Sequence, residues 1–125
     1  MVKYLSDEWL EQAAAALESA VVPDDAQMVI QYEVSGGGNG KVRYVLEVGG
    51  GRATIVPGKR ADAPVTFTLD YDTAVAVITG EVSAQVAFMQ GRMKLAGDVR
   101  VLIDGTAALA SVHDTLADLR ATTEY

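Results

Sequence analysis

Hydrophobic residues recur at every third or fourth position near the start of the chain and at every second position after that. The first spacing predicts an amphipathic helix over residues 6–20. Ser6 is suited to be its N-cap, and Asp7 and Glu8 would complement the helix dipole in the first turn. The apolar stripe of this helix comprises Trp9, Leu10, Ala13, Leu17 and Ala20.

The alternating pattern that follows predicts β-strands. It covers residues 27–34, 41–48, 52–56 and 65–69. A period of two gives each strand one buried face and one solvated face, as is typical of an antiparallel sheet. Glycine-rich segments separate the first three strands and predict hairpin turns. Val29 and Val45 stand on the solvated side, which indicates that part of this face is covered.

Helical signals return after the fourth strand. Asp70 is suited to cap a helix over residues 71–79. Ser83 is suited to cap a shorter helix, which Gly91 would end. Residues 92–96 then form a fifth predicted strand.

The last part of the chain is apolar with helical spacing. We expect Asp98 to cap the helix that begins there, and Gly105 argues against one unbroken helix to the end. The order of elements predicts an α+β fold. Its helices would gather on one face of a five-stranded, largely antiparallel sheet.

Length and composition narrow the class of protein. The 125 residues suit one domain over residues 1–125, and the lack of cysteine excludes disulfides and thiolate metal sites. A net charge of −7 argues against nucleic-acid binding. No apolar run approaches the length of a membrane span, and the polar start lacks the apolar region of a signal peptide. We therefore expect a cytoplasmic protein without stable membrane insertion.

Two groups of residues invite a catalytic interpretation. His113 and Asp114 would need a nucleophile, but Ser111 lies two residues from His113 and faces another side of a helix. Asp70 and Asp72 are explained by their place at a helix start. We predict no catalytic residue, no cofactor and no metal site, and a protein that is not an enzyme.

The most distinctive stretch is Ala87-Phe-Met-Gln-Gly-Arg-Met-Lys-Leu-Ala-Gly-Asp98, preceded by Phe67-Thr-Leu-Asp-Tyr-Asp and Thr79-Gly80. In these segments the chain resembles the sterol carrier protein type 2 family, the sterol-binding domain, of the stand-alone bacterial type. Two positions depart from the family pattern. Arg92 stands where lysine is usual, and Ala96 where a bulkier residue often sits.

The resemblance implies a fold and a function. It implies a five-stranded sheet and helices that enclose an apolar tunnel for sterols, fatty acyl chains or similar lipids, without a cofactor. The tunnel residues that carry over from the motif are Phe88, Met89, Met93 and Leu95. Helical spacing elsewhere adds Val75, Ile78, Leu102, Leu109, Val112 and Leu116. Each of these positions could equally be part of an ordinary core.

Two other functions stay open on the sequence. The fold could serve as an interaction or dimerisation module with a collapsed cavity, and a homodimer fits that alternative. A small enzyme acting on a hydrophobic substrate would instead need an ionisable residue inside the cavity. The candidates for that role are Asp70, Asp72, Asp98 and His113.

Overall fold

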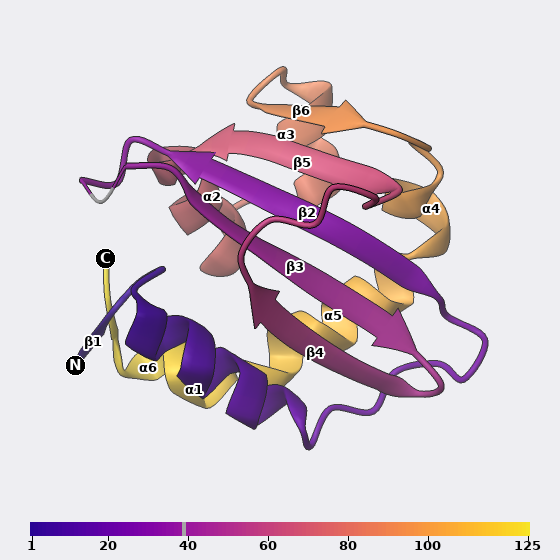
Figure 1. The fold of residues 1–125 in the computed structure, drawn as a ribbon, viewed down its shortest axis with the longest axis horizontal. Helices are drawn as coiled ribbons and strands as arrows, with labels where there is room; N and C mark the ends of the chain where they lie inside the picture. The colour runs from indigo at the N-terminus through magenta and orange to yellow at the C-terminus, as the bar shows by residue number, and fades with distance from the viewer. Residues whose placement is uncertain (39) are drawn as a thin grey trace.

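Five strands form the main sheet in the order β4-β3-β2-β5-β6 (Figure 1). The structure is a computed structural model that describes residues 1–38 and 40–125. The strands are β2 (Met28–Ser35), β3 (Val42–Gly49), β4 (Arg52–Pro57), β5 (Val65–Asp70) and β6 (Met93–Ala96). Neighbouring strands are antiparallel except β2 and β5, which run parallel. The predicted five-stranded, largely antiparallel sheet is confirmed.

One face of the sheet is covered by helices. The helices are α1 (Asp7–Leu17), α2 (Tyr71–Ile78), α3 (Ala84–Met89), α4 (Val101–Asp104), α5 (Thr106–Thr115) and α6 (Ala117–Ala121). Figure 1 shows α2, α3 and α5 on the same side of the sheet, with α1 beside the β4 edge. In the part of the chain that the structure describes, no helix has the length and apolar character needed to span a bilayer.

The predicted N-caps of three helices are present. The hydroxyl of Ser6 accepts a hydrogen bond of 3.1 Å from the backbone nitrogen of Trp9. The Asp70 carboxylate accepts one of 2.8 Å from Thr73, and the Ser83 hydroxyl one of 3.1 Å from Val86. Each cap satisfies a backbone donor that the first turn leaves free, and so fixes where its helix begins.

The opposite face of the sheet is covered in part by a loop. Val45 is buried there, as its apolar character indicated. Gln31, which the alternation placed on the solvated side, is buried as well. The segment after β4 crosses this face, and the backbone nitrogen of Arg60 donates a hydrogen bond of 2.8 Å to the Gln31 side-chain oxygen (Figure 1). The loop therefore shields the amide while satisfying it.

The prediction that Asp98 caps the next helix is wrong. Helix α4 begins only at Val101, and its N-cap position is Arg100, which makes no capping hydrogen bond through its side chain. The Asp98 carboxylate interacts with Arg100, two residues later, instead. It accepts a hydrogen bond of 2.9 Å from the backbone nitrogen of Arg100 and pairs with the Arg100 guanidinium at 2.6 Å. The expected interruption at Gly105 is confirmed, because α4 ends and α5 begins there.

The two ends of the chain lie side by side. Strand β1 (Val2–Lys3) pairs in parallel with β7 (Thr123–Glu124), and Figure 1 shows the N- and C-termini next to each other. Strands of two residues carry no periodic signal, so the sequence pattern did not predict them.

Candidate functional site

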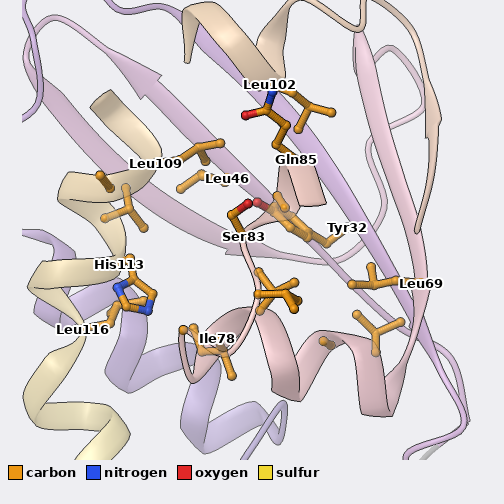
Figure 2. A pocket seen from close by; sticks show the side chains of 18 of the residues that line it. Tyr32, Leu46, Leu69, Ile78, Ser83, Gln85, Leu102, Leu109, His113 and Leu116 are labelled. Atoms are coloured by element: carbon orange, nitrogen blue, oxygen red, sulfur yellow. The ribbon is translucent and has the colours of Figure 1, made fainter. Parts of the chain in front are cut away.

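A cavity of about 360 Å³ lies between the helix-covered face of the sheet and the helices (Figure 2). This volume falls within the range of roughly 300–1,000 Å³ typical of small-molecule sites. Figure 2 shows side chains entering it from several elements, among them Leu46 and Leu69 of the sheet, Ile78 of α2 and Leu109 of α5. The cavity therefore depends on the packing of segments that are distant in sequence.

Aliphatic side chains make up most of the wall. On the sheet side each of β2, β3, β4 and β5 contributes one of them. On the helix side they come from α2 and from the segment that contains α4 and α5. The aliphatic lining residues larger than alanine are Val34, Leu46, Ile55, Leu69, Val77, Ile78, Val82, Leu102, Leu109, Val112 and Leu116.

Aromatic rings form the floor of the cavity on the sheet. Tyr32 of β2 lies directly opposite Tyr44 of β3 and opposite Phe67 of β5. The rings of Tyr32 and Tyr44 stack with centroids 4.8 Å apart, and Phe67 meets Tyr32 edge-on at 5.3 Å. Tyr4 also lines the cavity, and its hydroxyl makes a long hydrogen bond of 3.5 Å to the backbone oxygen of Ala74. The aromatic pairs of Tyr32 with Tyr44 and with Phe67 stabilise the fold beyond what burial of the rings alone contributes.

The tyrosine hydroxyl groups are neutral in this setting. Burial raises the pKa of Tyr32, and it is also the main cause of the raised pKa of Tyr4 and Tyr44. The nearby tyrosines raise the pKa of Tyr4 and Tyr44 further, since a second phenolate would repel the first. The three phenols are therefore hydrogen-bonding groups without charge at ordinary pH.

The mouth of the cavity is polar. Its exposed lining residues include Ser83, which precedes α3, and Gln85, which lies in α3. Thr106 and Asp114 of α5 are also exposed and line the cavity. His113 lines the same side of the cavity (Figure 2), and its Nε2 atom is buried without a hydrogen-bond partner in the described chain. Its Nδ1 atom lies 3.8 Å from the Asp114 carboxylate. Water can reach the exposed polar residues of this rim.

Five of the ten predicted site residues line the cavity. They are Ile78, Leu102, Leu109, Val112 and Leu116. The helical spacing that selected them follows one face of α2 and of the α4–α5 segment, and this is the face that the structure turns toward the sheet. Whether these residues contact a ligand stays a prediction.

The other five, four from the family-like motif and Val75, take different places. Phe88, Leu95 and Val75 are half-buried and Met93 is part of the core, but none lines the cavity. Met89 is 75% exposed. Helix α3 turns Ala87 into the core, so that Met89, two residues further on, points outward. The structure thus brings the α5 side of the predicted set together and leaves the α3–β6 side apart from it.

The sequence reasoning missed the strand residues of the floor. The alternation in residues 27–34 and 41–48 predicts a buried position for Tyr32 and for Tyr44, because each lies an odd number of positions from Val29 or Val45, but it does not point to a site. A signal was available, because a tyrosine on a buried face needs a partner for its hydroxyl, and two such residues face each other here. The pattern of either strand alone does not show that pairing.

Comparisons with known proteins agree on the family. The model of the SCP-2 sterol transfer family matches residues 3–109. Over 72 residues, or 57% of this chain, the sequence is 31% identical to sterol carrier protein 2 of Rattus norvegicus. The matched stretch is 13% of that relative, so the chain spans a small part of the relative's length.

Solved structures share the fold. One is a conserved hypothetical protein of Thermus thermophilus that is described as a possible sterol carrier protein. It has a TM-score of 0.73 at 20% identity, covering 94% of this chain and 90% of that one. Another is the palmitated SCP2L2 of Aedes aegypti, with a TM-score of 0.62 at 22% identity over 86% of this chain and 94% of that one. At these identities the likeness establishes the fold, and it confirms the predicted α+β class.

Proposed function

Since this chain belongs to the SCP-2 sterol transfer family, we propose that its cavity binds a sterol, a fatty acyl chain or a similar apolar lipid and carries it between sites. The observation that carries the proposal is the cavity of about 360 Å³, with walls that are mainly aliphatic and aromatic. The palmitated Aedes aegypti structure, which shares this fold, supports an acyl chain as one class of ligand.

The driving force for binding is removal of the ligand from water. Each 100 Å² or so of apolar ligand surface that enters the cavity contributes about 2.5 kcal/mol. Part of this gain offsets the loss of translational and rotational freedom on binding. A preformed cavity adds little further cost, because few side chains must be ordered when the ligand enters.

The proposed role is that of a carrier rather than an enzyme. Of the acid–base candidates that the sequence offers, Asp70, Asp72 and Asp98 do not line the cavity, and His113 lines it without a hydrogen bond, in the described chain, to a nucleophile of the kind that a triad needs. General acid–base chemistry requires a group within hydrogen-bonding reach of the reacting atoms. We further propose that the carrier is a single domain over residues 1–125 and that it works in the cytoplasm, which its cysteine-free composition suits.

A variant that fills the cavity tests the proposal. Leu109 is half-buried on α5 and lines the cavity, whereas Ala107 on the same helix is exposed and does not line it. We expect the Leu109→Trp protein to bind cholesterol and palmitate at least ten-fold more weakly than the wild type, as measured by native mass spectrometry. Ala107→Trp is the matched control, since it adds the same indole outside the cavity, and it should bind like the wild type.

Two results would count against lipid carriage. The first is a wild-type protein that retains neither lipid. The second is equal binding by the two tryptophan variants, which would place the ligand elsewhere. An unliganded wild type that light scattering shows to be an obligate dimer would favour the interaction-module alternative.

A further inference from the structure

The hydroxyl groups of Tyr32 and Tyr44 lack a hydrogen-bond partner within the described chain. Burial alone accounts for the pKa of Tyr32, and burial with neighbouring phenols for that of Tyr44, without a contribution from a hydrogen bond. Neither hydroxyl is among the fully buried polar atoms that lack a partner, which are those of Tyr71 and His113. Both hydroxyls therefore retain accessible surface.

That accessible surface faces the cavity. Tyr32 is half-buried, and both tyrosines line the cavity. Figure 2 shows the Tyr32 side chain extending from the sheet into the cavity. The sheet therefore presents two unsatisfied donors, held side by side by the stacked rings, to whatever occupies this space.

A purely hydrocarbon occupant fits these donors poorly. It would displace the water that can bond to the hydroxyls and would offer no acceptor in exchange. Sites that hydrogen-bond an oxygen of the ligand discriminate strongly against the analogue without it, because the protein groups are then left unpaired.

The charges around the cavity disfavour an anionic occupant. No lysine or arginine is among its lining residues in the described chain. The ionisable lining residues other than tyrosine are His113 and Asp114, and Asp114 is exposed at the mouth. A carboxylate moved into the aliphatic interior would lose its hydration without gaining a lysine or arginine partner.

We infer that the occupant is a neutral lipid with a hydroxyl or carbonyl oxygen. This oxygen enters the cavity ahead of the apolar body of the lipid and accepts hydrogen bonds from the phenols of Tyr32 and Tyr44. This inference rests on the proposed function and names the class of lipid and its orientation. The apolar body of the ligand then lies between the aliphatic side chains of the sheet and those of α2 and α5.

Competition binding with a hydrocarbon reporter tests the inference. Diphenylhexatriene contains no oxygen and fluoresces in apolar surroundings. Its fluorescence therefore reports how much of the cavity is occupied by a molecule that cannot accept a hydrogen bond. At pH 7.5 we expect 1-dodecanol to displace it at concentrations at least ten-fold lower than laurate, which has the same chain length and a carboxylate. Contacts between the carbinol protons and the rings of Tyr32 and Tyr44, measured as nuclear Overhauser effects, would report the orientation.

Removal of the two hydroxyls should erase this preference. The variants Tyr32→Phe, Tyr44→Phe and their combination keep the stacked rings. We expect the double variant to bind diphenylhexatriene at least as tightly as the wild type does, because no hydroxyl is left unpaired, and to bind 1-dodecanol at least ten-fold more weakly. Tyr71→Phe is the matched control, since Tyr71 also carries an unpartnered hydroxyl but does not line the cavity.

The modes of failure are distinguishable. If diphenylhexatriene and both lipids fail to bind the wild type, the proposed function itself is wrong. If the reporter binds but laurate competes as well as 1-dodecanol, the inference about the neutral ligand is wrong and the carrier function stands. The inference also fails if either single variant and the Tyr71→Phe control bind 1-dodecanol equally well.

Discussion

The indole nitrogen of Trp9 donates a hydrogen bond of 3.1 Å to the hydroxyl of Thr123, which lies 114 positions later in the chain. The Thr123 hydroxyl in turn donates to the backbone oxygen of Leu119. Trp9 and Thr123 are both buried. This relay joins the first helix to α6 and to the pair of terminal strands.

Replacing Thr123 by valine should destabilise the protein. Valine keeps the shape of the side chain but leaves the Trp9 N–H without an acceptor in a buried place, which costs about 1–3 kcal/mol. Urea unfolding, followed by the fluorescence of this single tryptophan, would measure the change in the free energy of unfolding. Thr122→Val is the control, because Thr122 is exposed and its replacement should change stability by no more than about 0.5 kcal/mol. Equal losses in the two variants would contradict the role of the relay.

Alanine at Gly97 should cost far more than alanine at Gly58. Both residues have positive φ angles, +112° and +102°, that favour glycine. A β-carbon at Gly58 would meet nothing within 4 Å, whereas one at Gly97 would lie 2.3 Å from the backbone oxygen of Pro64.

We expect the Gly58 variant to lose about 1–3 kcal/mol through backbone strain alone. The Gly97 variant should lose at least about 2 kcal/mol more, because the backbone beside β5 must also move. Unfolding midpoints in urea would give the difference between them. A Gly97→Ala protein as stable as Gly58→Ala would show that the chain relaxes there without penalty.

The Asp70 cap should make stability depend on pH. Hydrogen bonds from the side chain and the backbone of Thr73 hold the pKa of Asp70 below its ordinary value of 3.8. A lowered folded-state pKa means that the carboxylate stabilises the folded protein fully above pH 3.8. This contribution is lost as the pH falls through the lower folded value.

Asp70→Asn separates the charge from the cap, because asparagine is also a good N-cap residue. At pH 7 we expect the variant to be less stable by less than about 1 kcal/mol, since solvent screens an exposed charge. The difference from the wild type should shrink as the pH falls below 3.8, as followed by urea unfolding at several pH values. A constant difference across the pH range would mean that the charge of Asp70 plays no part.

Much of the fold could be predicted from the sequence because its signals are local. A cap such as Ser83 and a glycine such as Gly105 set the ends of helices within a few residues of themselves. Asp98 shows the limit of this reasoning. The same side chain can cap a helix or bond to the residues just after it, and the sequence does not decide between the two.

The site was harder to predict than the fold. Helical spacing identifies the face of α5 that turns inward, and Leu109 and Val112 on that face line the cavity. On α3 the predicted residue Met89 is exposed and does not line the cavity, and the sequence does not show whether an apolar residue of a short helix points inward or outward. Cavity walls and filled cores are built from the same residues, so only the three-dimensional arrangement shows where packing leaves space.

The pairing of β1 with β7 has a consequence for engineering of the chain. Because β1 and β7 run parallel, a linker that joins the two ends of the described chain must run back along the pair, from beside Glu124 to beside Val2. New ends opened at the exposed turn of Gly50 would lie between β3 and β4, away from the mouth of the cavity. A circular permutant of this kind would keep the helix-covered face continuous, and the same adjacency would let the unit be inserted into a surface loop of a host protein.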